Sequence, residues 1–231
     1  MERYSIIHEK NPREIVLLRG SGCIYRKCTF CDYHLDCCTD PAANFALNRE
    51  VLSHVTGQFG QLEVINSGSV FELDNETMDL IRHLCREKGI RTVHFESHYL
   101  YRERIAALRE SFRPVELKMK LGLETFDRHL REDVLHKGIP VSEPAEISQN
   151  FDEANLLVGV TGQTASSVRG DIELGLQHFE RLCVNVMCPN TTAVEPDRDV
   201  INAFLREVYP LYRDDSRVDI LINNTDFGVG D

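Results

Sequence analysis

Short apolar runs alternate with amphipathic segments along the chain, a pattern typical of strands and helices that follow one another in turn. The clearest run, Ile15-Val16-Leu17-Leu18, predicts a buried strand. The predicted strands cover 14–19, 62–66, 92–96, 116–124, 155–160, 183–187 and 218–222. The predicted helices cover 49–57, 76–88, 102–111, a segment from about 127 that breaks at 137–140, 144–153, 165–181 and 197–212. Residues 1–13 are expected to be a short lead-in, with Ile6 and Ile7 packed under the sheet.

Alternating strands and helices predict right-handed crossovers and a sheet of mainly parallel strands. About six such units fit an α/β fold of the partial (β/α)6, TIM-like barrel kind. No linker, low-complexity segment or repeat interrupts residues 1–231, so we expect a single domain. Barrels of this kind place their chemistry at the carboxyl ends of the strands, and nearly every predicted strand here ends in small, polar or acidic residues.

Three cysteines, Cys23, Cys28 and Cys31, lie at the spacing C-x4-C-x2-C in the loop after the first predicted strand. Thiols this close suit three kinds of site. A tetrahedral zinc site requires a fourth protein ligand, and disulfides require an oxidising compartment. An iron–sulfur cluster accepts three thiolates and keeps one iron open for a substrate or cofactor. No C-x2-C pair follows later in the chain, which favours the cluster.

Charge and hydropathy limit the possible partners. The formal net charge of −11 repels polyanions, which argues against long nucleic acids but allows a nucleotide-sized substrate in a local basic pocket. No apolar run reaches the roughly 18 residues that a membrane span needs. The first residues lack the basic and apolar regions of a secretory signal. We therefore expect a cytoplasmic protein with no membrane partner.

The other five cysteines are expected to form no disulfides in that compartment. Cys85 and Cys183 lie in apolar segments and should pack as small hydrophobic side chains, as should Cys188 at the end of one. Cys37 and Cys38 follow the cysteine loop closely. They are open to three interpretations: spare thiols, reactive thiols or alternative ligands.

The cysteine loop resembles that of the radical S-adenosylmethionine (SAM) enzymes, whose usual motif is C-x3-C-x2-C with an aromatic residue before the last cysteine. Phe30 takes the aromatic place, and the first gap is one residue longer than usual. The segment Asn66-Ser67-Gly68-Ser69 resembles the family's glycine-rich turn after the second strand, with Glu72 in place of its acid. Later segments that also resemble the family are Gly122–Asp127 with Leu135–Gly138, and Gly159–Thr164.

This resemblance implies a [4Fe–4S] cluster held by Cys23, Cys28 and Cys31, with SAM bound at the open iron. It implies that reductive cleavage of SAM yields a 5′-deoxyadenosyl radical, which takes a hydrogen atom from the substrate. An electron donor such as flavodoxin or ferredoxin is the implied partner. The resemblance places Glu124 at the ribose of SAM and residues 188–190 beside its adenine. The implied cofactor-binding residues are Phe30, Asn66, Ser67, Gly68, Ser69, Glu124, Cys188, Pro189 and Asn190.

Other polar and aromatic residues at the predicted strand ends are candidates to bind the substrate. Amides and carboxylates suit the donor and acceptor edge of a purine-like base, and aromatic rings suit its face. These candidates are Asp32, Tyr33, His34, Glu96, His98, Tyr99, Asn223, Asn224 and Asp226. Three of them, Glu96, His98 and Asp226, are also candidates for catalysis. A purely structural role explains His98 equally well, and a strand cap explains Asn223-Asn224.

The whole chain is similar to the small radical SAM queuine lyases of queuosine salvage, which release the base queuine from queuosine 5′-phosphate. That resemblance implies hydrogen abstraction from the ribose and loss of the base, with Asp226 or Glu96 pairing with queuine's secondary amine. One alternative is a radical SAM enzyme that acts on another small metabolite. Another is an activase that forms a glycyl radical on a partner enzyme, and a third is a non-enzymatic zinc-binding module.

Overall fold

The computed structural model describes residues 2–223, which form two compact units. Within these residues the first unit consists of 2–26 and 33–119, and the second of 27–32 and 120–223. The strands are hydrogen-bonded in chain order from β1 to β8. β5 begins in the first unit, where the Glu116 amide donates to the Arg91 carbonyl at 2.8 Å, and ends in the second. The expectation of a single domain stays a prediction.

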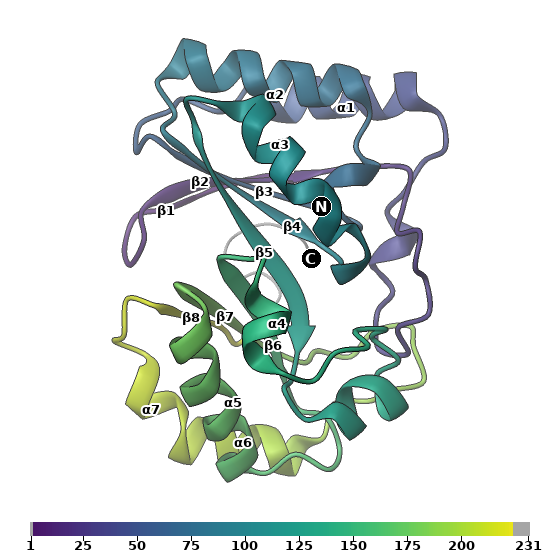
Figure 1. Ribbon diagram of the computed structural model, residues 1–231, viewed down its shortest axis with the longest axis vertical. Helices are drawn as coiled ribbons and strands as arrows, with labels where there is room; N and C mark the ends of the chain where they lie inside the picture. The colour runs from purple at the N-terminus through teal and green to yellow at the C-terminus, as the bar shows by residue number, and fades with distance from the viewer. Residues whose placement is uncertain (1, 224–231) are drawn as a thin grey trace. The chain divides into compact units, whose positions relative to one another are not determined.

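The first unit contains β1 to β4 and the helices between them (Figure 1). Its elements are β1 (Tyr4–Ile7), β2 (Arg13–Leu18), a 3-10 turn (Tyr33–Leu35), α1 (Pro41–Leu52), β3 (Gln61–Asn66), a 3-10 turn (Val70–Glu72), α2 (Asn75–Lys88), β4 (Thr92–Ser97), a 3-10 helix (Tyr99–Arg104), α3 (Ile105–Phe112) and the start of β5 (Glu116–Glu124). β2, β3 and β4 are parallel. The core lies between strands and helices: Phe95 on β4 is fully buried and meets Phe112 on α3 edge-on at 5.3 Å.

Two predictions at the start of the chain are wrong. The expected lead-in contains β1, which pairs antiparallel with β2 so that Tyr4 lies opposite Val16. The helix expected over 49–57 begins at Pro41 instead and ends at Leu52. Asp40 starts it, because its carboxylate accepts from the next amides and the proline that follows needs no amide partner in the first turn.

The second unit carries β5 to β8, which pair in parallel, and the helices α4 to α7. Its elements are the end of β5, a π-helix (His129–Val134), α4 (Pro144–Ser148), β6 (Glu153–Val158), α5 (Ala165–His178), β7 (Arg181–Val186), α6 (Arg198–Glu207), α7 (Tyr209–Tyr212) and β8 (Val218–Leu221). All predicted strands lie within two residues of the observed bounds.

Four helix predictions in this unit need correction. The helix expected over 165–181 ends at His178, because β7 starts at Arg181. The helix expected over 144–153 ends at Ser148, because β6 already starts at Glu153. The helix expected over 197–212 divides into α6 and α7, since Pro210 has no amide hydrogen to continue the bonding of α6. The segment expected to be a helix from about 127 is a π-helix.

Buried ion pairs join neighbouring strands in each unit, and sequence patterning did not predict them. In the first unit Arg13, 1% exposed, pairs with Glu63. In the second unit Arg181 bridges Glu153 at 2.8 Å and Asp219 at 2.9 Å. Removal of one partner from such a group leaves an uncompensated buried charge, so these groups are costly to disturb.

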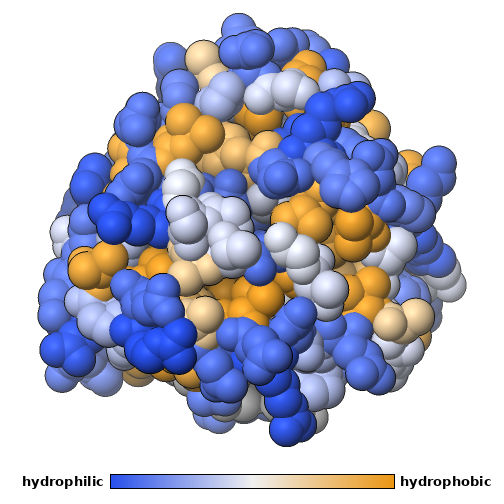
Figure 2. Space-filling model, turned by 90° about the horizontal axis from the view of Figure 1, so that it is seen from below, coloured by the Kyte–Doolittle hydropathy of each residue, from blue (hydrophilic) through white to orange (hydrophobic). Residues whose placement is uncertain are grey.

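No helix within residues 2–223 is long and apolar enough to cross a membrane. On the face drawn in Figure 2, hydrophilic residues predominate and the hydrophobic ones form several separate patches.

Candidate functional site

The segment that carries Cys23 is held by one buried carboxylate, that of Glu72. Glu72 is 8% exposed, and its Oε1 accepts from the Ile24 amide at 2.7 Å and the Tyr101 hydroxyl at 3.2 Å. Its Oε2 accepts from the Ser69 amide at 2.6 Å. Burial and then the Glu72 carboxylate raise the pKa of Tyr101 to about 12, so this hydroxyl stays protonated and donates. Glu72 therefore ties the residue after Cys23 to the turn that follows β3.

Gly68 brings this turn against the backbone of Cys23. A Cβ at position 68 would lie 3.1 Å from the Cys23 amide nitrogen and would overlap Glu72 Oε2. Only glycine allows so close an approach without displacing the cysteine segment. The small residues at this strand end thus serve the placement of Cys23.

Asn66 ends β3 with a buried acceptor that has no partner among residues 2–223. Its Nδ2 donates to the Ser69 carbonyl at 3.0 Å, whereas its Oδ1 accepts no hydrogen bond. The serine hydroxyls of the same turn are already engaged. Ser67 Oγ donates to Asp36 at 3.0 Å, and Ser69 Oγ accepts from the His98 amide at 2.9 Å. Buried polar atoms are nearly always paired, so Asn66 Oδ1 is the acceptor that this turn leaves for a ligand.

His98 caps the 3-10 helix that follows β4. Its Nδ1 accepts from the Leu100 amide at 3.1 Å, which places the proton of the neutral ring on Nε2. The ring stacks on Tyr25, with centroids 4.5 Å apart. The next residue, Tyr99, is 4% exposed and lies under the Arg102 guanidinium at 4.7 Å. His98 thus has a structural role, in capping this helix and in packing against the segment after Cys23.

In the second unit, the residues between Cys28 and Cys31 are fixed by backbone contacts and packing. Thr29 donates from its amide to the Leu135 carbonyl at 3.2 Å and from Oγ1 to the Val134 carbonyl at 2.7 Å. Phe30 packs on a cluster of buried apolar side chains at the end of the π-helix and of β6 and β7. The cluster consists of Leu130, Leu135, Leu157, Val160 and Met187. The family's aromatic position therefore anchors the segment that carries the second and third cysteines.

A buried ion pair lies beside Phe30. Lys137 Nζ is 2.8 Å from Glu124 Oε1 and 5.5 Å from the centre of the Phe30 ring. Burial opposes the charge of this lysine, but Glu124, followed by Cys28, outweighs burial and raises the pKa of Lys137 above its ordinary value. Glu124 sits at φ +73° in the β-bulge that ends β5. A non-glycine residue in this region is uncommon, and the ion pair with Lys137 holds it there.

The loop after β7 is bound to the same cysteine segment. Asn190 Nδ2 donates to the Phe30 carbonyl at 2.7 Å. Asp32 Oδ2 accepts from both the amide and the hydroxyl of Thr191 at 3.0 Å. Cys188 Sγ lies 3.7 Å from the Val186 carbonyl. Asn190 and Asp32 therefore position the cysteine segment within the second unit.

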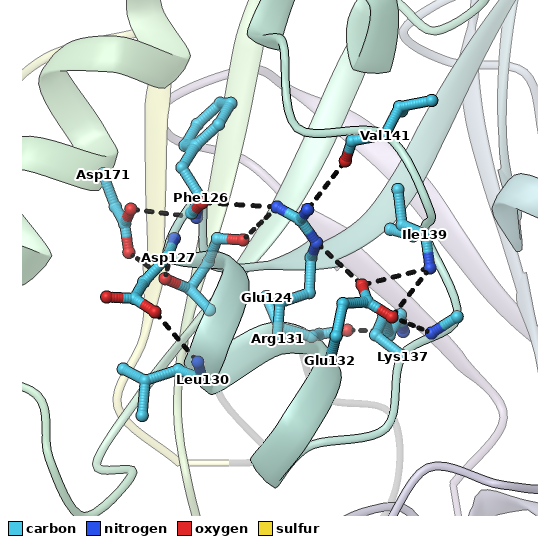
Figure 3. A network of polar contacts seen from close by, with 12 residues as sticks. Glu124, Phe126, Asp127, Leu130, Arg131, Glu132, Lys137, Ile139, Val141 and Asp171 are labelled. Atoms are coloured by element: carbon cyan, nitrogen blue, oxygen red, sulfur yellow. Dashed lines mark hydrogen bonds and ion pairs between the residues drawn. The ribbon is translucent and has the colours of Figure 1, made fainter.

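A fully buried arginine, Arg131, organises the turn after β5 and the π-helix (Figure 3). Arg131 donates to the carbonyls of Thr125 and Phe126 at 3.3 Å and to that of Val141 at 2.8 Å. Glu132 pairs with it at 2.9 Å. This network fixes the segment whose carbonyls hold Thr29. Sequence reasoning missed Arg131, because an arginine in an amphipathic segment usually faces water.

The predicted site residues fall into both units. Those in the first unit are Cys23, Tyr33, His34, Asn66, Ser67, Gly68, Ser69, Glu96, His98 and Tyr99. Those in the second are Cys28, Phe30, Cys31, Asp32, Glu124, Cys188, Pro189, Asn190 and Asn223. Asn224 and Asp226 lie outside the described residues. Within residues 2–223, no three His, Cys, Asp or Glu side chains converge as a metal site.

The remaining thiols differ in burial: Cys85 and Cys183 are buried, whereas Cys37, Cys38 and Cys188 are half-buried. None of the eight cysteines, all within residues 2–223, forms a disulfide. Cys85 and Cys183 are 1% and 6% exposed, which confirms that they pack in the core. The Sγ of Cys37 would lie 3.1 Å from a Cβ added at Gly22, so this thiol packs against the start of the Cys23 segment.

Comparison with known proteins identifies the family. The chain is similar over 100% of its length, and 100% of the other's, to a queuine lyase from Clostridium spiroforme bound to SAM and queuine, with 45% identity and a TM-score of 0.96. Streptococcus suis SuiB shares the fold alone, with 13% identity and a TM-score of 0.54 over 89% of this chain and 48% of that chain. No family model and no curated protein matches the chain.

The full-length similarity confirms the predicted α/β fold, a partial (β/α)6, TIM-like barrel of mainly parallel strands. The chain belongs to the queuine lyases, a family of radical SAM enzymes.

Proposed function

We propose that this chain is a radical SAM lyase that releases queuine from queuosine 5′-phosphate in a salvage pathway. The observation that carries the proposal is the 45% identity over the full length of a queuine lyase bound to SAM and queuine. The substrate is a small nucleotide, in keeping with a net charge of −11 that disfavours long nucleic acids. We place the reaction in the cytoplasm, with flavodoxin or ferredoxin as the electron donor.

We assign a [4Fe–4S] cluster and SAM to residues whose chemistry suits them. Cys23, Cys28 and Cys31 supply three thiolates for the cluster, the donor set that leaves one iron for another ligand. The unpaired Asn66 Oδ1 suits the amino group of SAM, which needs an acceptor. Glu124 binds Lys137 through Oε1, and we assign its Oε2 to the ribose hydroxyls. When bound together, the reduced cluster and SAM supply hydrogen-atom abstraction from the substrate.

The protein's own contribution is position and the exclusion of water. Glu72 and Gly68 hold the first cysteine against the turn after β3, while Phe30 and Thr29 hold the other two against the π-helix and β7. Pro189, next to Cys188 and Asn190, is assigned to the adenine of SAM. These supports keep the cofactor-facing atoms in place before substrate arrives.

Polar residues beyond the cofactor are assigned to the nucleoside. Glu96 is partly buried at the end of β4, and its carboxylate suits the secondary amine of queuine. We also assign His98, which caps the 3-10 helix through Nδ1, to the nucleoside. Tyr33 is 66% exposed, and we assign it and His34 to the aromatic face of the base. Tyr99, Asp32, Asn223, Asn224 and Asp226 complete the proposed set.

The experiment is anaerobic turnover. The chain is reconstituted with iron and sulfide and incubated with SAM, dithionite and queuosine 5′-phosphate, and 5′-deoxyadenosine and queuine are followed by mass spectrometry. Both products should rise together. Cys28→Ala should abolish both products and the brown colour, whereas Cys85→Ala, which removes a buried thiol from α2, should retain both. Formation of 5′-deoxyadenosine without queuine would contradict the proposal that queuosine 5′-phosphate is the substrate. Turnover retained in Cys28→Ala would show that Cys37 or Cys38 is the cluster ligand instead of Cys28.

A further inference from the structure

The first unit has a surface cleft of about 490 Å³ next to Cys23. Its walls include Cys23 itself, Ile24, Arg26, Phe71 and Tyr101. The rings of Phe71 and Tyr101 stand 5.0 Å apart and form an aromatic wall. A protein that sits in this cleft would therefore touch a residue assigned to the iron–sulfur cluster.

The cleft exposes apolar surface that the fold does not require. Ile24 is 69% exposed, although it directly follows the cysteine whose backbone is packed against Gly68. The rings of Phe71 and Tyr101 supply the rest of the cleft's apolar lining. Apolar side chains gathered in a surface hollow with a polar rim are typical of a protein–protein contact.

The rim of the cleft is basic, although the chain as a whole is acidic. Arg104 is exposed and stacks its guanidinium 4.5 Å from the centre of the Phe71 ring and 5.4 Å from that of Tyr101. Arg26 is also exposed, and its Nε donates to the Cys23 carbonyl at 2.8 Å. Glu72 also lines the cleft, but its carboxylate is buried and accepts hydrogen bonds from the amides of Ile24 and Ser69. The chain carries a net charge of −11, so this local reversal of sign selects an acidic partner.

Nearby acidic side chains do not cancel the rim. Glu103 is exposed, but its neighbour Arg102 lies 3.5 Å away as its ion-pair partner. That pair is neutral as a unit, whereas Arg26 on the cleft wall and Arg104 on its aromatic rings are both exposed.

We propose that this cleft docks an acidic one-electron carrier protein. The inference rests on the proposed function, because a radical SAM enzyme must receive one electron for each cleavage of SAM. The carrier is oxidised by one electron and the cluster is reduced by one, and no atom is transferred. A cleft beside Cys23 keeps the path to the cluster short. Complexes between redox partners bury small interfaces and are transient, and attraction between opposite charges speeds their association. A modest cleft with a basic rim is therefore enough to dock an acidic carrier.

The test compares two sources of electrons. Formation of 5′-deoxyadenosine is measured with dithionite and with reduced flavodoxin, in wild type, Arg104→Glu, Ile24→Ser and Arg86→Glu. Arg86 is the matched control, an exposed arginine on α2. Arg26 is left intact because it binds the Cys23 carbonyl. Flavodoxin binding to the unreacted chain is titrated in parallel, so that docking is measured without turnover.

Arg104→Glu should raise the flavodoxin concentration for half-maximal rate roughly five- to tenfold, weaken flavodoxin binding similarly and leave the dithionite-driven rate unchanged. Ile24→Ser should weaken binding less, and Arg86→Glu should match wild type. Added salt should slow the flavodoxin reaction alone. The proposal would be overturned if Arg104→Glu had the flavodoxin kinetics and flavodoxin binding of the wild type. It would also be overturned if Arg104→Glu lost as much activity with dithionite as with flavodoxin. A wild-type chain inactive with dithionite would overturn the proposed function, and the binding titration would still decide the docking.

Discussion

Glu72 offers the sharpest test of how the first cysteine is held, through the substitution Glu72→Gln. The carboxylate accepts from the amides of Ser69 and Ile24 and from the Tyr101 hydroxyl. Glutamine keeps an oxygen for Ile24 and Tyr101 but turns an NH₂ group toward the Ser69 amide, so two donors face each other. Ser69 is 1% exposed, and its amide is left without an acceptor.

The expected cost follows from that one lost bond. A hydrogen bond to a charged group contributes about 1.5–3 kcal/mol, and an unsatisfied buried donor costs about 1–3 kcal/mol. The two costs are partly the same free energy counted twice, so we expect a local destabilisation of about 2–4 kcal/mol. Each 1.4 kcal/mol is tenfold in an equilibrium constant, so amide exchange at residues 67–70 should accelerate roughly 30- to 1,000-fold. Exchange at residues 20–26 should accelerate less, because the Ile24 amide keeps an acceptor that has lost its charge.

Hydrogen exchange of the chain without cluster, followed by mass spectrometry, measures this directly. Peptides over 20–26 and 67–70 should exchange faster in Glu72→Gln, while peptides from the second unit should not change. The reconstituted variant should also lose iron to a chelator faster. The control is Glu87→Gln on α2, whose side chain is 54% exposed, and it should alter the free energy of unfolding by less than about 0.5 kcal/mol. Unchanged exchange at 20–26 would refute the claim that Glu72 holds the Cys23 segment.

Three further predictions concern single contacts. Asn66→Ala should raise the Kd for SAM about tenfold, because it removes the acceptor assigned to the amino group, and unchanged SAM binding by calorimetry would refute that assignment. Lys137→Met should leave Glu124 buried and unpaired and lower the free energy of unfolding by about 3–5 kcal/mol, whereas Lys137→Arg should lose less, as urea titration will show. Burial raises the pKa of Cys85 from 9.0 to about 12. As pH rises, the Cys85 thiol therefore loses its proton in the unfolded chain before it does so in the folded chain, and the free energy of unfolding should fall between about pH 9 and 12. Urea midpoints measured against pH should show this fall in the wild type and should lack it in Cys85→Ala.

Strands were predictable from the sequence because parallel strands in such a sheet read as apolar runs bounded by polar residues. β5 matches its predicted bounds, and the motif cysteines follow β2 as expected. Full-length similarity to a queuine lyase confirms the radical SAM assignment made from the cysteine spacing and three turns. These features depend on residues near one another in the chain, which is why a pattern reveals them.

Features that depend on distant residues escaped prediction. Arg181 is buried only because Glu153 and Asp219, on neighbouring strands, neutralise it. β1 is a strand because it adds to the edge of β2, and its four residues alone carry too weak a pattern. The π-helix at His129–Val134 follows from the tertiary position of Arg131, whose guanidinium binds carbonyls on both sides of it.

The structure separates the site residues into those that face a ligand and those that hold them. The polar side-chain atoms of Ser67, Ser69 and Glu72 already have partners within the first unit. Ser67 binds Asp36, Ser69 binds the His98 amide, and Glu72 binds the amides of Ser69 and Ile24. A residue with that many internal partners is a positioning residue, and its substitution should change the order of the loop before it changes ligand affinity. Asn66 differs, because an acceptor buried without a partner costs free energy in the unliganded chain. Such a cost is recovered when a donor binds, which is why the assignment of a SAM contact rests on Asn66 more firmly than on any serine of the same turn.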